Sequence, residues 1–307
     1  MKQLKFFLSK KIIKNITKFP IYLLLIGLTY IILYPFIFKI LSSFMSNNDL
    51  YNPLVIQIPQ EWTLSNFKYI FKETEFFSGF FNTLFFALVC AVFSTFSSAL
   101  VGYGIAKFRF PGVKILFGII ILTMLMPIQT ISLPLYTKFR FFDFLGLIKL
   151  FFDEGIELTN TIWPTLILSL TCLGFRAGIY VILMRQYYLG IPKELIEAAK
   201  VDGCDSYRTF FQVILPMAKS MLVVVFSLSF AWQWTDTFYS ELLCGGIKFL
   251  PTIVNLLNST MTGAVNSALQ YVYVNAAALL AVVPLLVFYC FFQKNIIQGI
   301  ESSGIVG

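Results

Sequence analysis

The sequence of 307 residues contains no histidine and few charged residues. Without an imidazole, the chain cannot build a zinc-protease motif, a Ser-His dyad or a histidine proton relay. Charged residues make up 12% of the chain, whereas a soluble domain carries roughly 25%. This supply cannot cover a compact soluble protein, so most of the surface must face an apolar medium. The mean hydropathy of +0.81 also excludes a disordered chain.

The cysteine pattern and the absence of a P-loop motif argue against two further classes of site, metal or disulfide sites and nucleotide sites. The five cysteines are scattered and form no Cys-x-x-Cys pair, so we expect neither a disulfide framework nor a metal site. No Gly-x-x-x-x-Gly-Lys-Ser/Thr motif occurs, so the chain has no P-loop with which to bind a nucleotide. We therefore expect no catalytic residues and no cofactor bound by this chain.

Long apolar runs are what the sequence has in abundance. A helix needs roughly 20 apolar residues to cross the hydrocarbon core of a bilayer. Counting residues between charges predicts an all-α polytopic membrane protein with six transmembrane helices, and leaves a seventh open. The predicted spans run about 19–38, 80–106, 115–136, 162–184, 220–239 and 272–292.

Two apolar stretches are too short or too polar to be spans. Phe141–Phe152 holds Asp143 and Lys149, and we expect it to be an interfacial helix. Phe249–Gln270 is uncharged but rich in Pro, Asn, Ser and Thr, and we expect a structured loop outside the membrane.

The basic residues predict the orientation. Most of the 23 lysine and arginine residues lie in the N-terminus, in the loop after the second span, after the fourth span and in the tail. By the positive-inside rule these parts are cytoplasmic, and both termini are inside. We therefore predict a basic cytoplasmic N-terminus at 1–18, a single transmembrane domain at 19–292 and a cytoplasmic tail at 293–307.

The long cytoplasmic segment at 186–216 has the pattern of two short helices. Pro192 suits a first helical position, Lys193–Val201 contains mostly good helix formers, and Gly203 suits the position just after a helix. A second helix is predicted at Tyr207–Leu215, ending at Pro216. It should carry an apolar face that needs a partner, made of Tyr207, Phe210, Phe211 and Ile214.

The spacing within this segment resembles a known motif. Glu197-Ala198-Ala199, three residues, Gly203, nine residues and then Val213-Ile214-Leu215-Pro216 resembles the EAA loop of ABC importer permeases, with Val213 in place of the usual Ile. In that family the loop docks on a cytoplasmic ATPase. The resemblance assigns ATPase coupling to Glu194, Glu197, Ala198, Ala199, Asp202, Gly203, Leu215 and Pro216. Without that context, the glutamates would be explained as a solvated helix face.

Other segments resemble the carbohydrate, maltose-type branch of this family. They are Asn82-Thr83-Leu84, Tyr103–Gly112, Met126-Pro127, Leu183–Gln186 and the tail Gln298–Gly307, whereas Thr235 stands where Asn is usual in Trp-Asn-Asp. The resemblance implies a type I ABC importer permease fold and a non-catalytic subunit of a bacterial plasma (inner) membrane. It also implies a second permease subunit in a heterodimer, two ATPase subunits holding ATP and Mg, an extracytoplasmic solute-binding protein and a carbohydrate substrate, with no nucleic acid.

The candidates for the substrate path are Arg176, Trp232, Trp234, Asp236 and Tyr239. A charge near the middle of a membrane usually faces a cavity or a partner, so Arg176 either lines the path or is paired within the assembly. The aromatic residues either stack on a sugar or form an interfacial belt, and Asp236 either accepts hydroxyl hydrogen bonds or is interfacial.

Other functions stay open at this point. An ABC importer of polyamines or amino acids would share the EAA loop. An ion-coupled secondary transporter or channel would usually place acidic or histidine relays within its spans. The predicted spans hold only Arg176 and Asp236 as charges, with Lys39 at the end of the first span. A membrane-embedded enzyme lacks support, because there is neither histidine nor a pair of intramembrane carboxylates.

Overall fold

The computed structural model describes residues 2–144, 146–148, 155–174, 176–254 and 267–304. Within these residues the regular elements are helices, accompanied by two isolated β-bridges, Met45–Trp62 and Phe142–Ile156. The chain divides into two compact units. The first comprises Met1–Thr74 with Leu257–Leu280, and the second Glu75–Leu256 with Ala281–Gly307.

The first unit contains α1 (Lys2–Ser43), α2 (Asn47–Tyr51), α3 (Ser65–Glu73) and the first turns of α15 (Ser267–Gly304). Polar contacts join these elements. The Asn275 side chain donates to Ser42 Oγ at 3.0 Å, and the Asn66 amide donates to the carbonyls of Ser43 and Met45. The rings of Tyr69 and Tyr273 stack with their centroids 4.2 Å apart.

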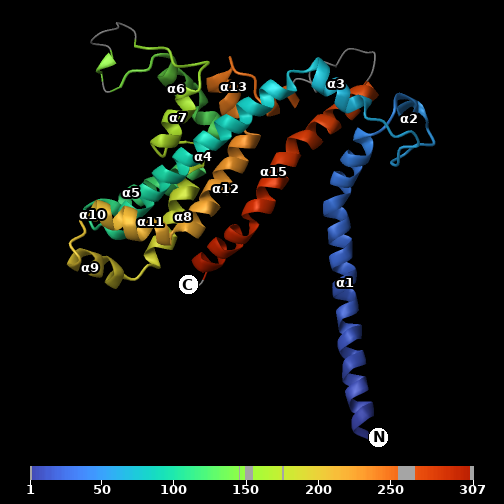
Figure 1. Cartoon of the computed structure of the whole chain (residues 1–307), viewed down its shortest axis with the longest axis horizontal. Coiled ribbons are helices and arrows are strands. Elements are labelled where there is room, and N and C mark those ends of the chain that lie inside the picture. Colours follow the sequence, from blue (N-terminus) through green and yellow to red (C-terminus); the bar gives the residue numbers. More distant parts are fainter. Residues whose placement is uncertain (1, 145, 149–154, 175, 255–266, 305–307) are drawn as a thin grey trace. The chain divides into compact units, whose positions relative to one another are not determined.

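The second unit is built around α4 (Phe76–Lys107), which packs along α8 (Ala177–Leu189) and α12 (Lys219–Thr235) (Figure 1). The remaining elements are α5 (Val113–Leu125), α6 (Ile128–Arg140), α7 (Trp163–Leu170), α9 (Lys193–Val201), α10 (Ser206–Arg208), the π-helical turn η2 (Thr209–Ile214), α11 (Leu215–Met217), α13 (Phe238–Cys244) and the last turns of α15.

Close backbone approach holds α4 against α8. A Cβ at Gly102 would lie 2.8 Å from Met184 Cβ and 3.0 Å from the Arg185 backbone nitrogen, so only glycine fits there. By contrast, a Cβ at Gly104, two residues further along the same helix, would meet open space.

The helices differ in whether they are long and apolar enough to cross a membrane. In the described residues, three helical segments are long and apolar enough to cross a membrane: Pro20–Ser43, Phe76–Lys107 and Leu269–Gly299. Two bent pairs would bring the number to five if each pair is one span. These segments include the first, second and sixth predicted spans, and the third and fifth fall on the bent pairs.

The third predicted span is not a continuous helix. It is divided into α5 and α6, which meet at an angle of 105°. The break is at Met126-Pro127, where Met126 has an extended backbone with ψ 126°. Proline lacks an N–H and disfavours the α conformation in the residue before it, which explains why the helix ends there.

The fourth predicted span is also interrupted. It consists of α7 and α8, with a break between Leu170 and Ala177. Two non-glycine residues in the break, Cys172 and Arg176, have left-handed backbones with φ values of 60° and 58°. Such a conformation stops an α-helix because the next amide no longer points along the helix axis.

Several smaller expectations meet the structure in part. The described residues of the predicted interfacial helix, 141–144 and 146–148, form no α-helix: they comprise turns and bends, and Phe142 pairs with Ile156 in a β-bridge. The rest of that stretch lies outside the described residues. In the predicted outer loop, 267–270 belong to α15, whereas 255–266 lie outside the described residues. The tail predicted from residue 293 is helical as far as Gly304.

Candidate solute cavity and coupling loop

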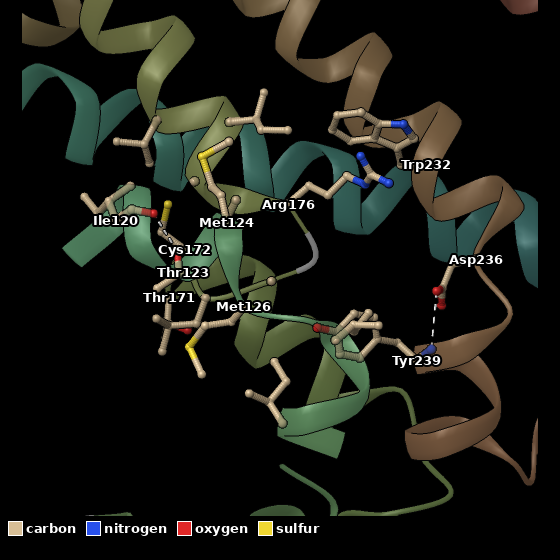
Figure 2. Close-up of a pocket in the computed structure, with 18 of the residues that line it drawn as sticks. Ile120, Thr123, Met124, Met126, Thr171, Cys172, Arg176, Trp232, Asp236 and Tyr239 are labelled. Carbon is tan, nitrogen blue, oxygen red and sulfur yellow. Dashed lines mark hydrogen bonds between the residues drawn. The ribbon is translucent and has the colours of Figure 1, made fainter. Parts of the chain in front are cut away.

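A cavity of about 970 Å³ opens in the second unit where both interrupted spans have their breaks. Its wall includes Met124, Met126 and Gln129 from the α5–α6 break and Thr171–Gly174 from the α7–α8 break. The end of α12 and the start of α13 complete it (Figure 2). Pockets of this size accept small organic ligands, and broken helices line the solute sites of many membrane transporters.

Four of the five predicted substrate-path residues line this cavity: Arg176, Trp232, Asp236 and Tyr239. Arg176 is exposed and immediately precedes α8. Its guanidinium carbon lies 4.4 Å from the centroid of the Trp232 ring, in cation–π contact. Figure 2 shows the guanidinium directed to this ring.

Asp236 is buried, and its carboxylate caps α13. One oxygen accepts from the Tyr239 N–H at 3.3 Å, and the other accepts from the N–H and the hydroxyl of Ser240, both at 2.9 Å. These bonds satisfy amides that a helix start leaves without intrahelical partners. Asp236 therefore has a structural role as the cap of α13, which the sequence did not indicate.

Trp234 lies outside the cavity wall. It is 1% exposed, its ring contacts Phe80 and Phe230, and its indole N–H donates to the Ala281 carbonyl at 3.0 Å. The α-helical spacing places it on a different side of α12 from Trp232, since two residues turn a helix by about 200°. Its contacts are those of a core residue.

The segment 186–216 ends its first helix with a Schellman motif. The Cys204 N–H donates to the Ala199 carbonyl at 2.9 Å, and the Gly203 N–H to the Lys200 carbonyl at 3.0 Å. Gly203 has φ +82°, the left-handed conformation that this motif needs. The structure places Gly203 just past the helix end, as expected, whereas Pro192 is the N-cap of α9 and not its first residue.

One side of this segment is buried in the subunit and the other is open. Ala199, Phe210 and Ile214 are buried, the last two in a cluster with Tyr103 and Tyr188. The open side includes Glu194, Glu197, Ala198, Asp202, Val201 at 87% exposure and Tyr207 at 77%. The predicted apolar face is therefore divided, because Phe210 and Ile214 pack inward while Tyr207 and Phe211 stay exposed.

The second helix of the segment differs from the prediction. It begins as α10, continues through the π-helical turn η2 and ends at Met217, one residue beyond Pro216. At Ala218 the chain bends by 78° into α12. A π-turn holds one extra residue per turn, and it brings Phe210 to within 4.9 Å of Tyr103 between ring centroids.

Both ends of the segment are tied to spans by side chains that sequence reasoning missed. Lys107, the last residue of α4, donates to the Ile191 carbonyl at 2.7 Å. The Tyr187 hydroxyl of α8 donates to the Met217 carbonyl at 2.7 Å. The family pattern could not reveal either contact, since each joins a side chain to a backbone carbonyl whose position only the fold determines.

Comparison with known proteins identifies the class. The profile of the family described as "Binding-protein-dependent transport system inner membrane component" matches residues 98–302. The chain belongs to this family. It is thus a membrane permease subunit of an ABC importer, and its transport depends on a separate binding protein; ATP hydrolysis belongs to another subunit.

Individual relatives cover nearly the whole chain. The arabinooligosaccharides transport system permease protein AraQ of Halalkalibacterium halodurans is 28% identical, over 93% of this chain and 96% of the relative. The galactooligosaccharides transport system permease protein GanQ of Bacillus subtilis is 30% identical, over 93% and 94%. A solved bacterial ABC transporter that imports the acidic polysaccharide alginate shares the fold, with a TM-score of 0.71, 21% identity and coverage of 93% and 97%.

Proposed function

We propose that this subunit forms half of the path by which a sugar or oligosaccharide crosses a bacterial plasma membrane, with both of its termini in the cytoplasm. A second permease subunit supplies the other half, and two ATPase subunits bind ATP and Mg. The names of AraQ and GanQ favour a saccharide as the solute. The supporting observation is the segment 186–216, exposed on one side and anchored to two helices on the other.

The proposed mechanism uses these anchors as the mechanical link. An ATPase docks on Glu194, Glu197, Ala198 and their neighbours on the open side, while Leu215 and Pro216 lead into the bend at Ala218. Movement of the docked segment then reaches α4 through Lys107 and α8 through Tyr187. Both helices contribute to the cavity wall. Their movement therefore changes the side of the membrane to which the cavity opens.

The cavity is proposed as this chain's part of the solute path. Trp232 and Tyr239 offer aromatic surface for the C–H faces of a saccharide, and Gln129, Thr171 and Thr235 offer hydrogen-bonding groups. Trp234 is proposed to support α12 from the core and not to touch the solute. Asp236 contributes through the position it gives to α13.

The test uses the complete importer in proteoliposomes with arabinotriose and galactotriose as probes. The Glu197→Ala variant is expected to lower ATP-dependent uptake by about tenfold or more, because it removes a charged contact at the centre of the docking surface. The matched control is Glu73→Ala, which removes an exposed carboxylate from a surface ion pair on α3. It should leave uptake within about twofold of the unsubstituted rate.

Both variants should insert into the membrane and should unfold at the same temperature as the unsubstituted protein. Full ATP-dependent uptake by Glu197→Ala would refute the coupling role. Uptake that survives without ATP but is abolished by an uncoupler would instead identify an ion-coupled transporter.

A further inference from the structure

An uncharged loop follows α2 in the first unit. Residues 50–60 contain no charged side chain, and the nearest charges are Asp49 and Glu61. Both carboxylates are used at the base of the loop. Asp49 accepts from the backbone N–H of Glu61 at 3.1 Å. The Glu61 carboxylate accepts from the side chains of Ser46 and Asn48, at 3.1 and 2.9 Å. The segment is therefore an Ω-type loop whose ends are held together.

The exposed aliphatic side chains lie at the opposite end of this loop from the charges. We call residues 55–58, with the sequence Val-Ile-Gln-Ile, the apolar tip. Ile56 is 78% exposed and Ile58 67%, although isoleucine is among the residues most often buried. A single exposed aliphatic residue is ordinary, but a charge-free tip that presents two of them indicates contact with an apolar partner.

The hydrogen bond of Gln57 fixes the direction of the loop. The Gln57 side-chain amide donates to the Tyr34 hydroxyl at 2.8 Å. Tyr34 lies nine residues before the end of α1 at Ser43, which is about 13 Å of helix axis. It is also within about one turn of residue 38, where the first span is predicted to end. The loop therefore turns back along α1 toward the membrane (Figure 1).

The surroundings of the apolar tip favour lipid as the partner. The described part of the chain buries no residue of α1 from 20 to 41, so the tip continues the exposed apolar surface of a membrane span. The loop consists of turns and bends, and such a backbone cannot enter the hydrocarbon core with its amides unpaired. It fits the membrane interface, where apolar side chains reach the acyl chains and tyrosine is enriched.

We propose that the apolar tip is a membrane anchor. Ile56 and Ile58 enter the boundary between the headgroups and the acyl chains, in the leaflet at this end of the first span. Gln57, between them, is bonded to Tyr34 and so needs no partner from the lipid. The anchor fixes the depth of the first unit in the membrane. This inference goes beyond the proposed function, because it does not depend on the solute.

Leu54 is exposed as well, but it lies nearer the base of the loop. It belongs to the turn that the Val55 N–H closes by donating to the Asn52 carbonyl at 3.0 Å. Asn52 is the C-cap of α2, whose other end is held by the charges at the base. Leu54 therefore stays at the water edge of the interface, where an aqueous reagent can reach it.

The test places an environment-sensitive NBD fluorophore on the apolar tip. Ile56→Cys or Ile58→Cys is introduced in a background in which the three cysteines that are not buried are replaced by serine: Cys172, Cys204 and Cys290. The complete importer, with partner subunits that lack cysteine, is labelled in detergent. It is then reconstituted without binding protein into phosphatidylethanolamine–phosphatidylglycerol vesicles. Quenching by a lipid with a nitroxide near its headgroup is compared with quenching by aqueous iodide.

The matched control is Lys72→Cys, at a charged and exposed position of α3 in the same unit. The ratio of nitroxide quenching to iodide quenching should be about fivefold or more higher at 56 and 58 than at 72. A second control shows that the protein, and not the dye, determines insertion. With the dye at 58, Ile56→Asp should lower nitroxide quenching by about half or more, whereas Ile56→Leu should leave it unchanged.

Three outcomes would overturn the anchor. Iodide quenching at 56 and 58 as strong as at 72 would place the tip in water. Protection from both quenchers would show that another polypeptide covers it. Protection from iodide that appears only when the binding protein is added would identify the tip as a docking surface for that protein.

Discussion

At the scale of single residues, Asp236 joins two parts of the second unit. It follows α12 directly, lines the cavity and caps α13 with three hydrogen bonds. The cavity wall near Tyr239 therefore depends on this carboxylate, whether or not a solute touches it.

Replacement of Asp236 tests the capping role. Asp236→Ala should destabilise the protein by about 1–2 kcal/mol, because the amides of Tyr239 and Ser240 lose their acceptor. Asp236→Asn keeps one acceptor oxygen and should cost less than half of that. Thermal unfolding in detergent measures both, with Glu241→Ala as the control for an exposed acidic residue of α13. Equal destabilisation by alanine and asparagine would contradict the capping role.

The segment 186–216 shows which structural features a sequence pattern can predict and which it cannot. Gly203 was predictable, because it follows the C-cap of a helix that ends at Val201, where a left-handed residue is commonly glycine. The inward packing of Phe210 was not, since a π-turn in η2 shifts its direction relative to an α-helix. Likewise, a spacing pattern cannot distinguish Trp232 in the cavity from Trp234 in the core.

At the scale of helices, the positions of apolar segments were predictable but their continuity was not. Hydropathy averages over about 20 residues, so it detects 115–136 and 162–184 as spans and is insensitive to a break inside them. The Met126-Pro127 pair carried a local signal for the first break. The second break depends on the left-handed backbones of Cys172 and Arg176, and these residue types do not predict that conformation.

The contact between α4 and α8 gives a paired prediction. Gly102→Ala should destabilise the second unit by about 1–3 kcal/mol, because the new methyl group would overlap Met184 and the backbone of Arg185. Gly104→Ala, two residues along the same helix, places its methyl in open space and should be neutral or slightly stabilising. Unfolding temperatures of the two variants provide the measurement. If both variants unfold alike, α4 and α8 do not approach as closely as described.

At the scale of the whole molecule, the inside–outside assignment is a prediction that rests on the distribution of basic residues. It places the segment 186–216 and the segment that follows the first span on opposite sides of the membrane. Both segments contain well-exposed apolar residues, Val201 at 87% and Leu54 at 81%, which are suitable reporters.

Cysteine labelling tests this topology. In a background with Cys204→Ser and Cys290→Ser, Val201→Cys should react with a membrane-impermeant maleimide only in inside-out vesicles. Leu54→Cys should react only in right-side-out vesicles. Labelling of both from the same side would mean that an even number of spans, and not the predicted three, separates the two positions. Labelling of Val201→Cys in right-side-out vesicles would remove the ATPase docking surface from the cytoplasm.

The meeting of two helix breaks at one cavity also limits where lipid can lie. Each interruption removes rungs from the ladder of backbone hydrogen bonds, and an amide or carbonyl group without a partner costs several kcal/mol in hydrocarbon. Acyl chains therefore cannot coat the flank formed by Met126-Pro127 and Thr171–Gly174. Water or another polypeptide must therefore cover that flank, and in an isolated copy of this subunit it would be exposed to water.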